Sequence, residues 1–257
     1  MGVPSDDAGW LALIRAGMPP LWSLMAEGSG GTVRAEGDVV AAIIPRVPDR
    51  SVFNSVFYED GGELIDSLEE IGAAYDEAGV RAWTVWVPES DTEVAAALEA
   101  AGHTNDAQPR AMAMATADLD KPEPDPSFDL RDELDMAEVG RLNEIAYGWP
   151  PGTFDVFAGA QVPDTYGHLA TLDGETVGCV VAWDDRDDAQ IVWVATLPEA
   201  RGRGIATALM ARAVEAAAQR GRLTTTLVAT ALGAPVYRKV GYRDFGALIM
   251  WERRKRE

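Results

Sequence analysis

Cysteine and histidine are scarce in this sequence of 257 residues, which holds one cysteine and two histidines. One cysteine excludes an internal disulfide, and Cys179, His103 and His168 do not form a zinc cluster pattern. Cys179 lies in the apolar run "ETVGCVVAW", so we expect a buried structural thiol, and His168 lies in a similar strand-like run. Neither histidine has a neighbouring serine or cysteine at the spacing of a catalytic triad.

Long apolar runs are absent as well. No stretch approaches the ~20 residues that cross a bilayer, and the acidic start "MGVPSDDAGW" is unlike a signal peptide. We therefore expect a cytoplasmic protein that makes no membrane contact.

Positive charge is scarce and unevenly distributed along the chain. The net charge is −20, with −16 carried by residues 1–125 and −4 by residues 126–257. Such an acidic protein is repelled by phosphate backbones, so we expect no nucleic-acid partner.

Proline and acidic residues gather in "DLDKPEPDPS", residues 118–127, which has the composition of a linker. We predict one domain at 1–120, a linker at 121–127 and a second domain at 128–257. In the second domain the patterns predict strands in 167–197 with a turn at Asp173-Gly174, a helix over 204–220, a strand in "TTTLVAT", a short helix in "GAPVYRKVG" and a final strand in "ALIMWER".

The first half repeats this order more weakly, with strands in "SVFNSVF", "RAWTVWV" and "RAMAMA" separated by two helices. The segment "LEAAGH" there corresponds to "YRKVGY" in the second half. The predicted fold class is therefore α+β, with two tandem copies of one module. Each copy is a mixed, mostly antiparallel twisted sheet flanked by helices.

The predicted helix at 204–220 begins unusually, with "ARGRGIATAL" at residues 200–209. A helix start offers about four unpaired N–H groups and the positive end of the helix dipole. Gly202 and Gly204 let a phosphate approach the backbone, and Arg201 and Arg203 add positive charge. The segment contains neither the lysine of a P-loop nor the GxGxxG of a dinucleotide site. The alternative is an ordinary exposed loop.

Arg201, Gly204 and Ala206, within "VATLPEARGRGIATAL", resemble motif A, [QR]xxGx[GA], of the GNAT superfamily of N-acetyltransferases. The segment "LVATALGAPVYRKVGYRDF" is similar to motif B of that superfamily, in which a tyrosine, here Tyr237, precedes a Gly-aromatic pair, here Gly241-Tyr242. The resemblance covers residues 128–254, about half of the chain.

The resemblance implies that the second domain binds acetyl-CoA as a cosubstrate, without a metal, between two splayed parallel strands. It implies that the backbone of Val194, Ala195 and Thr196 pairs with the pantetheine arm. Thr230 stands where the family often has an asparagine that contacts CoA. The expected pyrophosphate site is made by Arg201, Gly202, Arg203, Gly204, Ile205, Ala206 and Thr207.

Catalysis in such a site needs an acid and a base. The resemblance implies that Tyr237 protonates the departing thiolate, since an ordinary phenol stays protonated at neutral pH; the alternative is that Tyr237 only packs. The strand at 190–197 contains no carboxylate, and we interpret Asp184, Asp185, Asp187 and Asp188 as a solvated hairpin. We do not nominate Glu199, which belongs to the motif's lead-in. We expect the acceptor's proton to leave through a water relay.

The corresponding junction in the first half, "FYEDGGELIDSL", has Glu59 and Asp60 in place of the arginines. Close carboxylates repel a pyrophosphate by ~1 kcal/mol or more per pair. We expect a degenerate copy that binds no CoA, supports the second copy and helps to shape the acceptor cleft.

The acceptor is expected to be a small-molecule amine. The segment 147–167, which covers the acceptor in this superfamily, contributes Trp149, Phe154, Phe157 and Tyr166, either to an apolar pocket or to lid packing. The acidic charge favours a cationic amine, and we expect a monomer or homodimer. The alternatives are a CoA-binding regulatory or sensor protein and an acyltransferase with a non-CoA donor; the −16 charge of the first half disfavours aminoacyl-tRNA.

Overall fold

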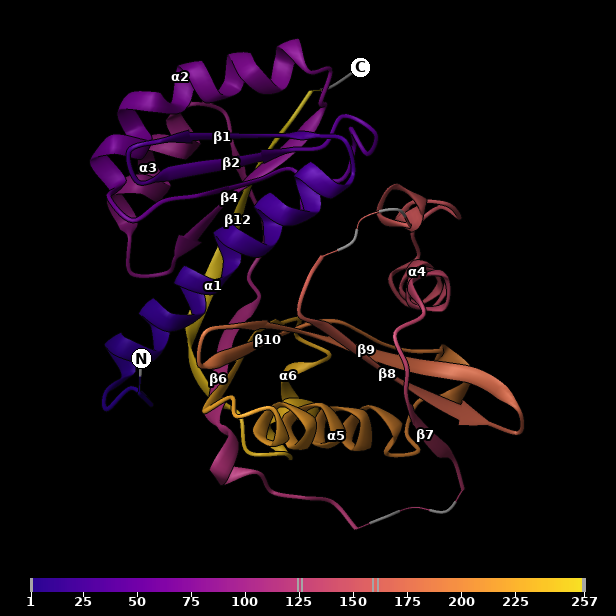
Figure 1. The fold of residues 1–257 in the computed structure, drawn as a ribbon. Coiled ribbons are helices and arrows are strands. Elements are labelled where there is room, and N and C mark those ends of the chain that lie inside the picture. The colour runs from indigo at the N-terminus through magenta and orange to yellow at the C-terminus, as the bar shows by residue number, and fades with distance from the viewer. Residues whose placement is uncertain (1, 124, 126, 159, 161, 256–257) are drawn as a thin grey trace. The chain divides into compact units, whose positions relative to one another are not determined.

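The computed structural model describes residues 2–123, 125, 127–158, 160 and 162–255 (Figure 1). It divides into two units. Unit 1 comprises the chain up to Gly17, Ala111–Ala158 and Val162–Phe245, and unit 2 comprises Met18–Arg110 and the chain from Gly246 onward. These units differ from the domains expected at 1–120 and 128–257, because the last strand of each sequence half is counted with the other unit.

Unit 1 contains a mixed sheet that has one pair of parallel strands beside antiparallel ones. Its order is β6-β11-β10-β9-β8-β7, and β10 and β11 are the parallel neighbours. The strands are β6 (Arg110–Ala115), β7 (Asp129–Asp132), β8 (Thr165–Leu172), β9 (Glu175–Asp185), β10 (Asp188–Thr196) and β11 (Thr224–Ala229). The helices are α4 (Met136–Tyr147), α5 (Ile205–Gln219) and α6 (Ala234–Arg238), with short 3-10 turns η1 (Thr116–Asp118), η2 (Phe154–Phe157) and η3 (Pro198–Ala200).

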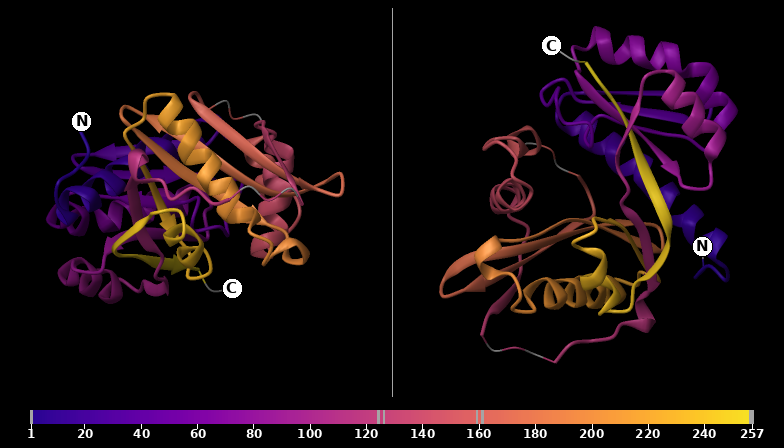
Figure 2. Two further views of the ribbon diagram at one scale, coloured as in Figure 1. Left: turned by 90° about the horizontal axis from the view of Figure 1, so that it is seen from below. Right: turned by 180° about the vertical axis from the view of Figure 1, so that it is seen from behind.

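Helices cover both faces of this sheet. Helix α4 contacts β9 and β10, and α5 contacts β8, β9 and β10 (Figure 1). The two helices lie on opposite faces, which the view from behind also shows (Figure 2). The core between them is apolar and contains Cys179 among its buried residues.

Helix α5 forms where the apolar spacing predicts it. Ile205, Leu209, Ala213 and Ala217 recur at helical spacing and are all buried. Gly178 in β9 lets the helix approach closely, since a Cβ there would come within 3.0 Å of Leu209 Cδ1. The helix ends before Gly221, whose φ of +84° suits the left-handed conformation that often follows a helix.

Unit 2 repeats the same plan with a smaller sheet. Its order is β1-β2-β3-β4-β12, β5 pairs with β12, and β3 and β4 are the parallel neighbours. The strands are β1 (Thr32–Glu36), β2 (Val39–Ile43), β3 (Ser55–Phe57), β4 (Ala82–Pro88), β5 (Thr104–Ala107) and most of β12 (Arg243–Arg254). The helices are α2 (Gly61–Glu77) and α3 (Thr92–Ala100). Both units thus confirm the predicted α+β class, with mostly antiparallel sheets flanked by helices.

The N-terminal helix α1 (Asp7–Gly28) was not predicted from the sequence, because Pro19 and Pro20 stand inside it. It contributes residues to both units. Within the residues that the structure describes, no helix combines the length and apolarity needed to cross a membrane.

Candidate active site

A cavity of about 300 Å³ lies in unit 1 beside β10, the start of α5 and helix α6. The structure brings almost all of the predicted site residues to its wall, namely Val194, Ala195, Thr196, Arg201, Gly202, Gly204, Ile205, Ala206, Thr207, Thr230 and Tyr237. Arg203 does not line it. The remaining wall comes from Ala146, Tyr147, Ala200, Leu232, Gly233, Val236 and Lys239, which the sequence analysis did not nominate.

The cavity lies where the two parallel strands separate. Pairing between β10 and β11 runs from Asp188–Thr224 to Ile191–Leu227. A bulge follows in β10 between Val192 and Ala195, and Trp193 within it has a φ of +49°. Beyond the bulge, Ala195 and Thr196 still pair with β9 but no longer with β11. Their other edge is therefore available to an extended ligand.

The start of α5 offers its backbone amides without a side-chain cap. Gly204 is the residue before the helix and has a φ of +81°, and Gly202 has a φ of +79°. Both lie in the left-handed region that favours glycine. The first turn contains no acidic residue. This helix start keeps both its unpaired N–H groups and its positive dipole end, which together suit an anion.

The equivalent helix start in unit 2 is satisfied by its own chain. Asp60 caps α2, and its Oδ1 accepts hydrogen bonds from the N–H groups of Gly62 over 2.7 Å and Glu63 over 3.2 Å. Asp60 thus occupies, with its carboxylate, the position that an external anion would take. This contact adds a local reason to the expectation that the first copy binds no pyrophosphate.

The two arginines before α5 differ in their surroundings. Arg201 donates from Nε to the carbonyl oxygen of Thr196 over 3.2 Å and from Nη2 to that of Ala146 over 3.3 Å. These bonds tie the end of β10 to the last turn of α4. Arg201 also lines the cavity, and its expected contact with a phosphate stays a prediction. Arg203 is exposed and forms no hydrogen bond or ion pair with any residue that the structure describes.

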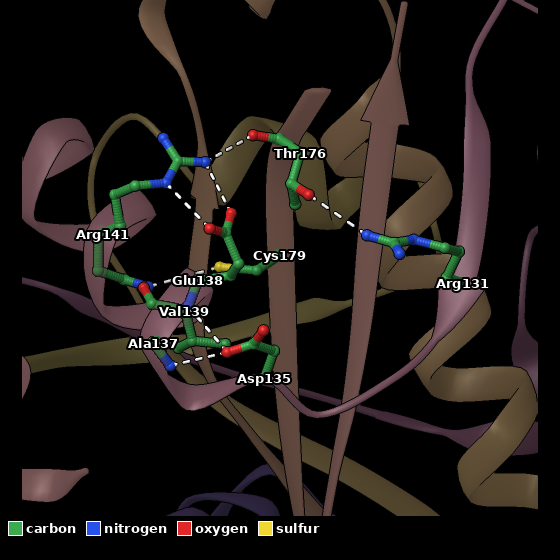
Figure 3. A network of polar contacts seen from close by, with 9 residues as sticks. Arg131, Asp135, Ala137, Glu138, Val139, Arg141, Thr176 and Cys179 are labelled. Carbon is green, nitrogen blue, oxygen red and sulfur yellow. Dashed lines mark hydrogen bonds and ion pairs between the residues drawn. The ribbon is translucent and has the colours of Figure 1, made fainter. Parts of the chain in front are cut away.

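Helix α4 is held against the sheet by a polar network of its own (Figure 3). Asp135 caps the helix by accepting from the N–H groups of Ala137 and Glu138. Arg141 pairs with Glu138 and donates to the carbonyl oxygen of Thr176 in β9 over 2.8 Å. This network fixes the first half of α4, and at the other end of the helix Ala146 and Tyr147 join the cavity wall.

Tyr237 is placed on α6 with its phenol against the backbone. It is 8% exposed, and a Cβ on Gly233 would come within 2.9 Å of Tyr237 Oη. The Oη makes no hydrogen bond to a described residue, and burial raises the pKa of Tyr237 far above its usual value. Burial thus favours the protonated form of the phenol. Tyr147, 44% exposed, brings a second phenol to the cavity wall.

Thr230, between β11 and α6, accepts a hydrogen bond on Oγ1 from the N–H of Gly233 over 3.1 Å. Its hydroxyl hydrogen remains available to a ligand, because Thr230 donates to no described residue. The threonine that replaces the family's asparagine thus orders the loop and lines the cavity.

Aromatic side chains pack around the bulge of β10. Trp193 contacts the rings of Phe154 and Phe157 with centroids 5.8 Å and 6.0 Å apart, and Trp149 stacks between Tyr147 and Phe154. Four aromatic residues of segment 147–167 were expected to cover the acceptor. Tyr166 is not part of this ring cluster and lies instead under the guanidinium of Arg220. Residues 159 and 161 of that expected cover lie outside the described residues.

The acidic turn between β9 and β10 corrects one expectation. Asp184 and Asp188 are not solvated: Asp184 pairs with Arg220 over 2.8 Å, and Asp188 accepts from Thr224 Oγ1 over 2.7 Å and from Thr226 Oγ1 over 2.6 Å. Charge on α5 and hydroxyls on β11 make burial of these carboxylates possible. None of the turn's aspartates lines the cavity.

Cys179 is buried in β9 behind the bulge, and its thiol donates to the carbonyl oxygen of Trp193 over 3.3 Å. Burial raises the pKa of Cys179 to about 12, so the thiol is not a nucleophile. His168 in β8 bonds to Asp132 through Nδ1 over 2.8 Å, away from the cavity. In the described ranges, no cluster of three or more His, Cys, Asp or Glu side chains is placed to hold a metal.

Comparisons with known proteins agree with this geometry. Residues 163–244 match the family model described as "Acetyltransferase (GNAT) domain". A GCN5-related N-acetyltransferase from Kribbella flavida has a similar structure, with a TM-score of 0.66, 19% identity and coverage of 91% of this chain and 95% of its own. A GCN5-related N-acetyltransferase from Sphaerobacter thermophilus also has a similar structure, with a TM-score of 0.66, 19% identity and coverage of 100% of this chain and 95% of its own.

A tandem GNAT protein from the clavulanic acid biosynthesis pathway gives a TM-score of 0.60 and 14% identity, covering 83% of this chain and 77% of its own. No curated protein matches the sequence. At these identities, the structural similarities show that the chain has the fold of those proteins.

Proposed function

We propose that this chain, whose residues 163–244 match the family model of the GNAT acetyltransferase domain, transfers the acetyl group of acetyl-CoA to the amine of a small molecule. The observation that carries the proposal is the cavity of about 300 Å³ between the separated strands, with an uncapped helix start on its wall. No metal takes part in the proposed reaction.

The diphosphate of CoA fits the start of α5. The backbone amides from Gly202 to Thr207 would hold it, and Arg203 would add a positive charge from outside the cavity wall. The glycines are required because a side chain at Gly202 or Gly204 would need a positive φ. The pantetheine arm would lie along Val194, Ala195 and Thr196, pairing with the open edge of β10 as an added strand.

Tyr237 is the proposed general acid. As the amine nitrogen bonds to the thioester carbon and the C–S bond breaks, the phenol gives its proton to the sulfur. The proton released by the amine returns the phenolate to its neutral form through water, so that the reaction is balanced. Burial holds the phenol in its protonated form before the transfer, and the role itself is proposed from the place of Tyr237 on the cavity wall.

A protein base is not part of the proposal. Glu199 and the aspartates from Asp184 to Asp188 do not line the cavity. Of these aspartates, Asp184 pairs with Arg220 and Asp188 accepts hydrogen bonds from threonine hydroxyls. We therefore propose that water accepts the proton of the attacking amine, which reacts in its unprotonated form.

The proposed acceptor is a small, partly apolar amine. Trp193, which is half-buried and packs on the buried rings of Phe154 and Phe157, supplies an apolar surface at the bulge, next to Val194 on the cavity wall. The net charge of −20 favours a cationic molecule and disfavours nucleic acid. We propose that the protein works as a monomer or homodimer in the cytoplasm.

The test has two parts on the full chain. Calorimetry measures acetyl-CoA binding, and a thiol-release assay with acetyl-CoA screens amino acids, polyamines, aminoglycosides and peptide N-termini as acceptors. Binding with thiol release for at least one amine class supports the proposal. Binding without release for any amine favours a regulatory or sensor protein, and a lack of acetyl-CoA binding overturns the proposal and favours a different acyl donor.

A further inference from the structure

The bulge in β10 contains a tryptophan in a strained conformation. The pairing with β9 shifts by one residue between Val192 and Ala195. Trp193 and Val194 therefore stand together opposite a single residue of β9. Trp193 has a φ of +49°, which a residue with a side chain adopts only at a cost in free energy. Such a conformation persists where the surrounding contacts hold it.

Two buried donors hold the carbonyl oxygen of Trp193. The thiol of Cys179 donates to it over 3.3 Å, and Nδ2 of Asn143 donates to it over 3.5 Å. Cys179 belongs to β9 and lies beside α4 (Figure 3), and Asn143 belongs to α4 itself. Both residues are 0% exposed. The carbonyl needs these donors, because a buried carbonyl without a partner costs free energy.

The side chain of Asn143 is held in place by its own helix. Its Nδ2 donates to the carbonyl oxygen of Val139, one turn earlier in α4, over 2.8 Å, and it also lies 3.5 Å from Sγ of Cys179. An amide nitrogen carries two hydrogens, so one serves the helix and the other is directed at the thiol and the bulge. Asn143 and Cys179, which we call the bulge anchor, thus connect α4 and β9 to the bulge.

The position of the bulge decides where the edge of β10 becomes open. Beyond it, Ala195 and Thr196 pair with β9 and no longer with β11. If Trp193 relaxed to an extended conformation, the pairing beyond it would shift by one residue, and a shift of one residue turns every side chain to the other face of the sheet. The planar trans peptide after Trp193 also directs the N–H of Val194, a residue of the cavity wall, away from the bulge anchor.

We propose that Asn143 and Cys179 are positioning residues of the cosubstrate site. By holding the carbonyl of Trp193 they keep the bulge in place, and the bulge keeps the backbone of Ala195 and Thr196 open to the pantetheine arm. This inference rests on the proposed function. It adds to that function two buried residues that do not line the cavity, and it makes the single cysteine of the chain a hydrogen-bond donor.

Substitutions of similar size separate this role from packing. Cys179→Ser keeps a hydrogen-bond donor and Cys179→Ala removes it, while serine and alanine have almost the same volume. Asn143→Leu removes the amide and fills its space. Val181→Ala is the control, because Val181 lies two residues further along β9 on the same face, is 0% exposed and has an apolar side chain that donates no hydrogen bond.

The experiment measures acetyl-CoA affinity by calorimetry and the free energy of unfolding in urea, on the full chain. Cys179→Ala and Asn143→Leu are each expected to weaken acetyl-CoA binding about tenfold, because only part of the free protein then keeps the bulge in its binding form. Cys179→Ser and Val181→Ala are expected to bind within about twofold of wild type, although Val181→Ala lowers stability at least as much as Cys179→Ala does.

Wild-type affinity in either Cys179→Ala or Asn143→Leu would overturn the proposal. A loss in Cys179→Ser or Val181→Ala equal to that in Cys179→Ala would also overturn it, by assigning the effect to packing. If Asn143→Leu does not fold, the comparison of the three β9 variants decides alone. All of these results leave acetyl-CoA binding by wild type, and so the proposed function, intact. A wild type that binds no acetyl-CoA would instead remove the proposed function and this inference together.

Discussion

Arg201 donates from Nη2 to the carbonyl oxygen of Ala146 over 3.3 Å and so links the loop after β10 to the last turn of α4. Arg203, two residues further on, has no partner among the described residues. The two arginines of the motif therefore carry different tasks. Arg201 holds the backbone around the cavity in place, and the exposed guanidinium of Arg203 is available to bind a charged ligand.

Arg201→Ala and Arg203→Ala should separate these tasks. Loss of Arg201 removes two hydrogen bonds to backbone carbonyls and should lower the free energy of unfolding by about 1 kcal/mol. Loss of Arg203 should leave stability unchanged and weaken acetyl-CoA binding several-fold, equivalent to about 1 kcal/mol, with a smaller salt dependence than wild type. Urea unfolding and calorimetry measure the two effects. Equal stability of both variants would contradict this division.

The helix caps of the two units predict a second pair of variants. Gly204→Asp would place a carboxylate at the start of α5, where it would compete with the diphosphate for the same amides; it would also put an aspartate in the left-handed region, unlike Asp60, whose backbone is extended. We expect a loss of acetyl-CoA affinity of more than 100-fold, roughly 3 kcal/mol, with the fold retained. Asp60→Ala is the control: it should cost about 1 kcal/mol of stability and leave acetyl-CoA binding unchanged.

Tyr237→Phe should act on catalysis. The Oη makes no hydrogen bond to a described residue, so its removal leaves no polar group unpaired in the protein. We expect thiol release to fall on the order of 100-fold or more, with acetyl-CoA affinity nearly unchanged. Tyr242→Phe is the matched control, since Tyr242 is also buried but does not line the cavity. Equal losses of affinity and turnover in Tyr237→Phe would mean that the phenol only packs.

Asp188 should make stability fall as the pH rises. Burial raises the pKa of this 6% exposed carboxyl from about 3.8 to about 6, against the hydrogen bonds from Thr224 and Thr226. Between these values the native state holds a proton that the unfolded state has lost, so ionisation costs stability, by about 3 kcal/mol at pH 7.

The variant Asp188→Asn has no such ionisation. Its free energy of unfolding, measured in urea relative to wild type at each pH, should therefore rise by about 2.4 kcal/mol from pH 4 to pH 7. A difference between variant and wild type that is constant with pH would show that Asp188 titrates near its ordinary value.

The thiol of Cys179 should not react with thiol reagents in the native protein. Its thiol is buried and its pKa is raised to about 12. We expect no reaction with a disulfide reagent until urea unfolds the chain, when one thiol per chain should react. A thiol-release assay therefore needs no correction for the protein's own cysteine, and rapid reaction of the native protein would contradict the buried position.

Local sequence was sufficient for the elements that build the anion site. The spacing of Ile205, Leu209, Ala213 and Ala217 predicted α5, and Gly202 and Gly204 predicted its unusual start, because periodicity and backbone freedom are properties of neighbouring residues. Leu232, Gly233 and Lys239 lie within the segment that resembles motif B, but the resemblance pointed only to Thr230, Tyr237 and the Gly241-Tyr242 pair.

Tertiary structure alone decided which charges are used and which wall each side chain joins. The sequence does not distinguish Arg201 from Arg203, but in the structure only Arg201 contacts the end of α4. The sequence predicts a solvated Asp188, but in the structure its carboxylate accepts hydrogen bonds from Thr224 and Thr226 of β11. Tyr147 lines the cavity from the end of α4, about 90 residues before Tyr237, and no local sequence pattern indicated that the two side chains share one site. These outcomes depend on contacts between segments that are distant in the sequence. Burial and hydrogen bonding set the charge and the pKa of a side chain, and both arise only when those segments pack together.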